Sequence, residues 1–454
     1  MLKRFLARRA GHLVLFLAAS GCLCRGEVAQ AQVTAKTLIG KAVSDDKEYK
    51  DIDNAIERFS DRDIDGCRAI LERARNNNGK LPPPGVMMAM LWLSVNQLMP
   101  ARAELEQTVV KFAGDPEPYL MLADLAFQDR RVTDSSVLFD RATQLTASFA
   151  DNPKRKRDFE IRCNAGTAAV AEARREWDAA QKYLATWIGL DPDNAGAHFR
   201  LGNVLFHLDK ESEAVEQFRE ARKLDANALQ PELALARLYD EDGKKDVAKK
   251  WIEAAMKASP EDSAVLLASA QWYLGQNDLK TATSISDKAL ALDSKSLEAK
   301  IVRGVVARVA RDYASAEKFF NEAHLQSPGN FPASNSLALV LIESEDKESQ
   351  QRAVEMAEAN VARYRENSPQ QVSALTTLAW IYYKLGRRED AEKILDQIAR
   401  NNALSSDGAY YVAKLLTDRG EKDRAKTILE RVLTNEAVFA TRPDAIDLLE
   451  QLKK

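Results

Sequence analysis

The sequence predicts an all-α protein built from one repeated pair of helices, and three observations carry this prediction. Glycine and proline are scarce, at 19 and 14 of 454 residues, while alanine and leucine recur throughout; this bias favours helices. Apolar residues recur at helical spacing in segments separated by short polar turns. The chain also resembles itself at a fixed period of 34 residues, and periods of this size indicate a repeat architecture.

The composition excludes several classes of protein. Lys and Arg total 65 against 68 Asp and Glu, which gives a net charge of −3. That balance lacks the basic surplus of a dedicated nucleic-acid-binding protein. Hydrophobic residues at 45% and charged residues at 29% exclude wholesale disorder and a multi-span membrane protein. We therefore expect a folded chain without a nucleic-acid partner.

Residues 1–31 are predicted to be a signal peptide. Lys3 and Arg4 begin a positive segment, and an apolar run follows over residues 13–23. This run is too short for a membrane span, which needs about 20 residues. Ala29-Gln30-Ala31 offers the small-x-small pattern that signal peptidase accepts. We expect cleavage after Ala31, export to the periplasm or the medium, and a linker over residues 32–47.

A second interpretation of the leader stays open. Residues 19–22 resemble a lipoprotein box with Cys22 acylated, although the usual leucine three places before the cysteine is missing. The protein would then be a membrane-anchored lipoprotein, and a membrane partner is expected only in that case. In either case Cys67 and Cys163 remain, and two cysteines 96 residues apart predict separate buried thiols.

The 34-residue register continues after the linker, with two insertions. The predicted repeats are 48–81, 82–115 and 116–149, then, after a basic insert at 150–160, five repeats over 161–330, then 331–371 (seven residues longer), 372–405 and 406–439. Prolines near place 32 of a repeat, such as Pro192, Pro260 and Pro328, are expected to end its second helix. Residues 440–454 are expected to form a helix that caps the stack.

Each repeat carries small residues at places eight and twenty. Its short polar turn makes the two helices antiparallel, and they can cross closely only where no large side chain separates their backbones. The residues expected at these crossings include Ala89, Ala123, Ala168, Gly202, Ala214, Ala236, Ala248, Ala270, Ala282, Gly304, Ala316, Ala379, Ala391, Ala413 and Ala425.

This pattern resembles the tetratricopeptide repeat (TPR) family, whose 34-residue unit carries small residues at these places. The resemblance covers nearly all of residues 48–454, although large aromatic residues are missing from place four except at Tyr119. It implies a right-handed superhelical α-α solenoid of about eleven repeats. Together with the leader, the chain resembles an exported bacterial TPR protein.

The resemblance also implies that the first helices line a concave groove, with places 2, 5, 9 and 12 facing inward. Methionine suits adaptable recognition, and Trp and Tyr are frequent binding anchors. The alternative, that neighbouring side chains bury these groups, stays open. The candidate partner-binding residues are Met90, Leu93, Leu120 and Phe127 at one end of the chain and Trp380, Tyr383, Tyr410 and Lys414 at the other.

The sequence contains no recognisable pattern for catalysis, metal binding or a cofactor. His198 and His207 are nine residues apart on one predicted helix, so they point to opposite sides and cannot share a metal. The basic run over residues 154–157 either binds an anionic ligand or begins a solvated helix. We expect a non-catalytic scaffold outside the cytoplasm that binds a peptide or protein, with a role in cell-envelope assembly or export. The alternative is an accessory or regulatory module of a secreted enzyme or a surface-polymer (glycan) system.

Overall fold

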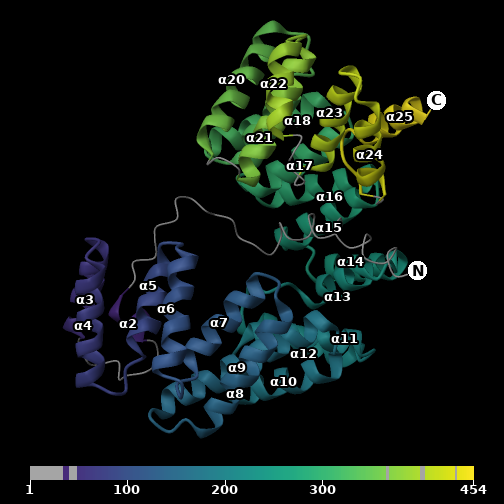
Figure 1. Cartoon of the computed structure of the whole chain (residues 1–454). Coiled ribbons are helices and arrows are strands. Elements are labelled where there is room, and N and C mark those ends of the chain that lie inside the picture. The colour runs from purple at the N-terminus through teal and green to yellow at the C-terminus, as the bar shows by residue number, and fades with distance from the viewer. Residues whose placement is uncertain (1–33, 40–48, 365–367, 399–403, 435–436, 454) are drawn as a thin grey trace. The chain divides into compact units, whose positions relative to one another are not determined.

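The computed structural model describes residues 34–39, 49–364, 368–398, 404–434 and 437–453. Helices are the only regular elements in these ranges, so the predicted all-α class is confirmed (Figure 1). No helix in the described part of the chain is long and apolar enough to cross a membrane. The predicted signal peptide, including Cys22, lies outside the described residues.

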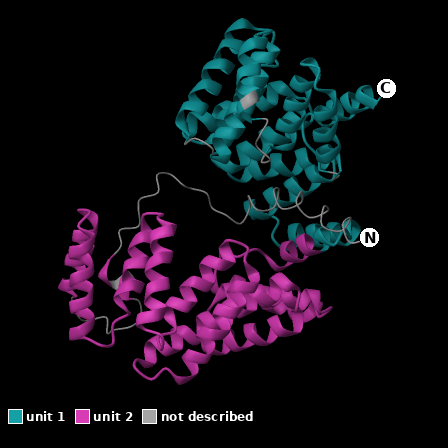
Figure 2. Ribbon diagram, in the orientation of Figure 1, with its two compact units in different colours: residues 1–24, 239–454 teal, residues 25–238 magenta. Residues whose placement is uncertain are grey.

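The chain divides into two compact units (Figure 2). We call residues 25–238 the N-terminal unit and residues 239–454 the C-terminal unit; residues 1–24, grouped with the latter, are not described. In both units, helices that are consecutive in the sequence contact each other as pairs. Each unit is therefore an α-solenoid of stacked helix pairs.

The N-terminal unit begins with one short helix, followed by five helix pairs. Its helices are α2 (Ala35–Ile39), α3 (Lys50–Ser60), α4 (Ile64–Asn77), α5 (Pro84–Ser94), α6 (Leu98–Lys111), α7 (Glu117–Gln128), α8 (Val132–Ser148), α9 (Pro153–Arg174), α10 (Trp177–Leu190), α11 (Ala195–His207) and α12 (Glu211–Leu224). Helix α13 (Pro231–Glu241) contains the boundary between the units.

The C-terminal unit continues the pattern and ends with a single helix. Its helices are α14 (Lys245–Ala258), α15 (Ser263–Gly275), α16 (Leu279–Leu292), α17 (Leu297–Val309), α18 (Tyr313–Gln326), α19 (Phe331–Leu341), α20 (Lys347–Arg363), α21 (Pro369–Lys384), α22 (Arg388–Ile398), α23 (Ser406–Asp418), α24 (Lys422–Leu433) and α25 (Arg442–Lys453). From α3 to α24 the odd-numbered helices are the first helices of the repeats, and the even-numbered ones are the second.

Local chemistry explains where many of these helices begin and end. The side chain of Asp262 accepts hydrogen bonds from the backbone at the start of α15, and Asn330 does the same for α19; such caps satisfy the first free N–H groups of a helix. Helices α10, α14 and α18 each end two residues before a proline. Proline has no N–H to continue the helix, so the second helix stops there.

The turn inside a repeat reuses one backbone conformation. A residue with positive φ follows the first helix at 34-residue intervals, for example at Arg62, Asn96 and Arg130, and Gly243, Gly386 and Gly420 occupy the same place in later repeats. At Asn96 the next residue, Gln97, donates its N–H to the carbonyl of Trp92. This left-handed residue ends the helix and reverses the chain.

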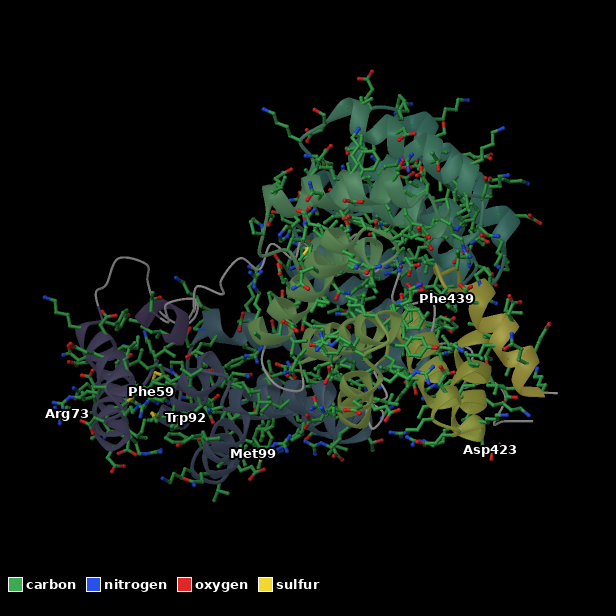
Figure 3. The ribbon with its side chains drawn as sticks, turned by 90° about the horizontal axis from the view of Figure 1, so that it is seen from above. Phe59, Arg73, Trp92, Met99, Asp423 and Phe439 are labelled. Atoms are coloured by element: carbon green, nitrogen blue, oxygen red, sulfur yellow. The ribbon has the colours of Figure 1, made fainter. Side chains whose placement is uncertain are left out.

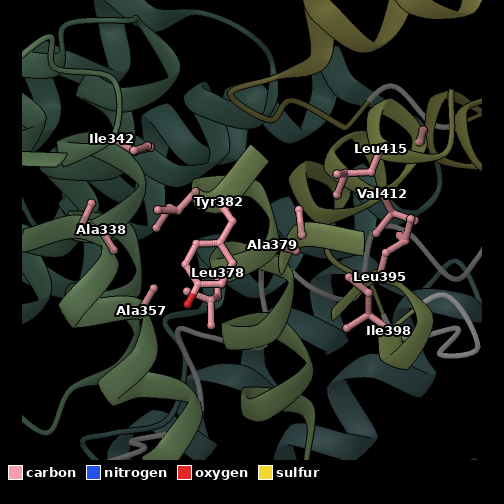
Figure 4. Close-up of a cluster of buried hydrophobic side chains, with 14 of the residues drawn as sticks. Ala338, Ile342, Ala357, Leu378, Ala379, Tyr382, Leu395, Ile398, Val412 and Leu415 are labelled. Carbon is pink, nitrogen blue, oxygen red and sulfur yellow. The ribbon is translucent and has the colours of Figure 1, made fainter. Parts of the chain in front are cut away.

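Close helix crossings form the core of each repeat. The small residues at places eight and twenty are buried, including Ala89 and Ala214 at 0% exposure. A Cβ on Gly202 would lie 2.5 Å from a ring carbon of Phe218, and one on Gly304 would lie 2.7 Å from Phe320. In the C-terminal unit, buried side chains from α17 to α25 join into one apolar cluster (Figure 4).

Two segments differ from their prediction. Residues 153–160, expected as part of an insert, form the start of α9, because the Asn152 side chain caps the backbone of Lys154 and Arg155 and Pro153 favours a first turn. The expected linker contains α2, whose Leu38 is 0% exposed. Leu38 and Ile39 are buried because α2 packs against α3 and α5. The 34-residue period does not predict this packing.

Candidate functional site

The aromatic residues expected at the C-terminal end come together on first helices. Trp380 and Tyr383 belong to α21, Tyr410 and Tyr411 to α23, and Leu339 to α19. Together they form one apolar cluster, which we call the aromatic cluster. Because α21 contacts both α19 and α23, the cluster spans three successive repeats.

Trp380 is the centre of the aromatic cluster. Its ring stacks on Tyr411 with centroids 4.4 Å apart, and on Tyr383 at 5.3 Å, while Tyr410 meets it edge-on at 5.7 Å. Trp380 is only 7% exposed, whereas Tyr383 and Tyr410 are half-buried. Trp380 therefore supports the two tyrosines from below and is not itself an exposed anchor.

Charged side chains surround the two half-buried tyrosines. Tyr383 donates its hydroxyl hydrogen bond to Asp418 over 2.7 Å, and Lys414 donates to the other oxygen of that carboxylate over 3.2 Å. Burial raises the pKa of Tyr410 to about 12. Burial, together with Asp418, raises the pKa of Tyr383 to the same value. Both phenols consequently stay protonated at neutral pH, and Lys414 is already paired with Asp418 before any partner binds.

A largely buried ion pair fixes the start of α23, next to the aromatic cluster. Arg308 on α17 pairs with Asp407, and the other oxygen of Asp407 accepts hydrogen bonds of 2.9 and 2.8 Å from the backbone and hydroxyl of Thr441. Burial opposes ionisation of Asp407, but Arg308 and Thr441 outweigh it and lower the pKa of the carboxyl group. The pair joins repeats that are 99 residues apart in the sequence.

The N-terminal candidates are more dispersed. Met90 and Leu93 are half-buried on α5 and pack with Trp92 against the adjoining clusters. The ring of Trp92 meets Phe59 of α3 edge-on, with centroids 4.9 Å apart (Figure 3). These side chains make an apolar surface on the first helices α3 and α5.

The other two N-terminal candidates lie on α7. Leu120 is 0% exposed and belongs to the core with Phe139 and Phe159, so it cannot contact a partner. Phe127 is half-buried beside the same core. Leu120 occupies an inward place of its repeat, but the long helix α9 contacts α7; the sequence period did not reveal this cover.

One charged residue of the basic run is buried. Arg155 is 4% exposed, and its guanidinium pairs with Asp115 at 2.9 Å and Glu117 at 2.7 Å. Its charge also lies over the rings of Phe149 and Phe159. Burial raises the pKa of Glu117, while Arg155 and Arg162 oppose that shift. The run is thus a helix start with one buried ion-pair network, and Arg155 is not available to an external anion.

Two cysteines and two histidines have structural contacts. Cys67 and Cys163 are buried free thiols, as expected, and burial raises the pKa of Cys67 to about 11. His198 bonds Gln217 and the carbonyl of Pro192 at 2.7 and 3.0 Å, and His207 stacks on Trp177. Among the described residues no group of His, Cys, Asp and Glu side chains could hold a metal ion.

A cavity of about 250 Å³ lies between α4, α6 and the start of α5, lined by Arg68, Glu104 and Lys111 among others. Arg68 donates to Glu104 over 2.8 Å at its wall. None of the candidate partner-binding residues lines this cavity.

Comparison with protein families agrees with the repeat geometry. A tetratricopeptide repeat model matches residues 166–228 and 376–437, and a second tetratricopeptide repeat model matches residues 233–262. The chain is a tetratricopeptide repeat protein. The second match of the first model contains the aromatic residues of α21 and α23. TPR repeats are protein-interaction modules, and TPR proteins bind peptide or protein partners.

Several solved structures resemble this TPR protein at low identity. A tetratricopeptide repeat protein from Parabacteroides merdae is 12% identical, with a TM-score of 0.39, covering 65% of this chain and 99% of its own. Yeast Tom70 is 15% identical, with a TM-score of 0.39, covering 89% and 95%. The APC/C hetero-tetramer Cut9–Hcn1 gives 12% identity and a TM-score of 0.40, covering 88% and 95%. None of the curated protein sequences matches significantly.

Proposed function

We propose that this TPR protein is a non-catalytic scaffold that binds a peptide or protein segment at the aromatic cluster. The supporting observation is the stack on Trp380, which holds Tyr383 and Tyr410 side by side on adjacent first helices. Aromatic rings fixed in place lose little conformational freedom on binding, so they are effective anchors. The half-buried rings offer apolar contact, and the hydroxyl oxygen of Tyr383, whose proton is donated to Asp418, can accept a hydrogen bond.

The charges around the cluster suggest the chemistry of the bound segment. Lys414 and Lys384 flank the rings, but Asp418 and Glu343 already pair with them. An acidic group of the partner would replace these carboxylates as the counter-charge of the lysines. Because solvent-exposed ion pairs contribute little, this exchange would add little binding free energy. We therefore infer that most of the affinity comes from apolar and aromatic side chains of the partner, and that charge tunes its orientation.

A photo-crosslinking experiment tests this site. A benzophenone amino acid in place of Tyr410 should crosslink to a discrete partner in the native host. The same group in place of Leu325, which is 71% exposed on the second helix α18, serves as the control. Equal crosslinking at both places, or none at Tyr410, would move the site to the N-terminal surface around Met90 and Phe127.

Truncating Tyr410 measures how much its side chain contributes to the binding free energy. Tyr410→Ala should weaken capture of the crosslinked partner by roughly thirtyfold, which corresponds to about 2 kcal/mol. Tyr183→Ala, at a 38% exposed tyrosine on the second helix α10, should leave capture unchanged. Trp380 is a poor choice for this test because its removal would also disturb the packing of Leu339 and Tyr411.

We also propose that the scaffold works outside the cytoplasm, in assembly or export at the cell envelope. The support is the leader pattern in the sequence, a positive segment and an apolar run followed by Ala29-Gln30-Ala31. A fluorescent or enzymatic reporter fused after Lys454 should be found outside the cytoplasm, and deletion of residues 1–31 should retain it inside.

A further inference from the structure

Helix α2 packs against the first helices of the first two repeats. It contacts α3 and α5 (Figure 1). Its apolar residues are buried there, with Leu38 at 0% and Ile39 at 4% exposure. They join a cluster that includes Met87, Met88 and Leu91 of α5. Several other pairs of successive first helices contact each other directly, as α7 contacts α9 and α21 contacts α23.

The stability of α2 comes from the surface beneath it. A helix of five residues has no appreciable stability of its own, because a single turn does not repay the cost of helix nucleation. The apolar cluster that α2 joins is rich in methionine: Met87 and Met88 are buried in it, and half-buried Met90 packs against it. Methionine side chains adapt to ligands of different shape. The N-terminal surface is thus suited to a short apolar helix, and α2 is one.

We propose that residues 35–39 are a tethered ligand, and that a partner's short helix with two adjacent aliphatic residues binds the same surface when α2 leaves it. This inference rests on the proposed scaffold function but concerns a separate place, α3 and α5. Cleavage after Ala31 would leave three residues ahead of Ala35, so processing would retain α2. Docking of α2 lowers the apparent affinity of the partner. The apparent affinity is the intrinsic affinity multiplied by the fraction of molecules in which the surface is open.

The test uses the chain from residue 32 onward, which contains every described residue. The probe is a fluorescein-labelled peptide of residues 32–41, QVTAKTLIGK. The variant Leu38→Asp with Ile39→Asp places two charges where burial is nearly complete, so it should release α2. Fluorescence anisotropy should show the probe binding this variant at least tenfold more tightly than the unaltered chain.

Two matched controls accompany this measurement. A probe with the same two aspartates should not bind the double variant. The substitution Val137→Asp changes a 63% exposed valine on the second helix α8, and that variant should bind the probe as weakly as the unaltered chain. Crosslinking at Tyr410 reports on the aromatic cluster alone, so its failure and the failure of this inference are distinguishable.

Several results would overturn the inference. The inference is wrong if the probe does not bind the double variant, or if it binds the double variant and the unaltered chain with equal affinity. A dimer of the unaltered chain in sedimentation that depends on Leu38 and Ile39 would show that α2 docks on a second copy. If the double variant does not fold, hydrogen exchange of the unaltered chain still tests the inference. The Leu38 and Ile39 amides should exchange at least tenfold faster than those of α5, and equal protection would make α2 a permanent part of the core.

Discussion

At the scale of single residues, the tight helix crossings and the largely buried charges allow the clearest energetic predictions. Gly304 faces the ring of Phe320 with no space for a side chain, and Asp407 is held by Arg308 and Thr441. The first feature follows from a small residue recurring every 34 places. The second does not, because Arg308 and Asp407 lie three repeats apart and their places in the register give no sign of a contact.

The Gly304 crossing predicts a loss of stability on adding one methyl group. In Gly304→Ala the new Cβ would lie 2.7 Å from Phe320, so the ring must shift, at a cost of about 1–3 kcal/mol. Thermal melting followed by circular dichroism should show a lower midpoint. Gly275→Ala is the control, since nothing lies within 4 Å of its Cβ; its midpoint should stay or rise slightly. Equal melting midpoints for both variants would contradict a close contact between Gly304 and Phe320.

The ion pair at Asp407 predicts a pH-dependent contribution. Asp407→Asn leaves Arg308 largely buried without its counter-charge and should cost about 3 kcal/mol at pH 7. Because the folded pKa of Asp407 is lowered, this stabilisation is complete above the unfolded pKa of about 3.9 and disappears as the pH falls through the folded value. Urea unfolding of the two proteins should therefore converge in acid.

The exposed pair of Arg311 and Asp444 provides the comparison for that variant. Asp444 is 39% exposed at its side chain, so Asp444→Asn should change the free energy of unfolding by less than about 1 kcal/mol. A cost for Asp407→Asn no larger than this would mean that the Arg308 pair is solvated.

At the scale of elements, the helix boundaries follow the repeat except where a helix lengthens. Helix α9 begins before its predicted repeat because Asn152 caps it there. Helix α20 has 17 residues, so part of the extra length of repeat 331–371 lies within its second helix. Local capping and apolar content decide the lengths of these helices, and a fixed period of 34 residues cannot predict such differences in length.

The start of α9 predicts a strong effect of a single arginine. Arg155→Met keeps apolar contact with Phe149 and Phe159 but leaves Asp115 and Glu117 buried without their cation, a loss of about 3–5 kcal/mol at pH 7. The pKa of Glu117, already raised by burial, should rise further. The folded variant then binds more protons than the unfolded chain, so its stability should increase as the pH falls from 7 toward about 4.3.

Lys154→Met is the control from the same basic run, because Lys154 is exposed. Its free energy of unfolding should stay within about 0.5 kcal/mol of the unaltered chain at each pH. Urea titrations at pH 5 and 7 measure both variants. A stability of Arg155→Met that does not improve at pH 5 would contradict the buried network.

At the scale of the whole molecule, the period predicts the fold well and the candidate site in part. The period and the small residues identify the helix pairs from α3 onward, and the inward places lead to Tyr383 and Tyr410. For Trp380 the alternative interpretation, burial by neighbouring side chains, is the correct one; the sequence did not identify its closest stacking partner, Tyr411, because Tyr411 lies outside the inward places. Helix α2 was missed because its five residues show no period, and its burial depends on a surface formed by two distant helices.

The leader makes one prediction for the chain as a whole. Mass spectrometry of the protein from its native host should find an N-terminus at Gln32, since Ala29-Gln30-Ala31 offers the small residues that signal peptidase requires. An N-terminus at an acylated Cys22 would instead identify a membrane-anchored lipoprotein, and an intact Met1 would exclude both forms of processing.

The left-handed residue found in most of these turns has a consequence for engineering. Arg62, Arg130 and Arg175 hold a conformation that costs a residue with a side chain about 1 kcal/mol, whereas Gly243 adopts it without that steric penalty. Three glycine exchanges at turns far apart should therefore act additively and together raise stability by up to about 3 kcal/mol. The natural chain can therefore be stabilised further without changing the aromatic cluster or the surface on α3 and α5.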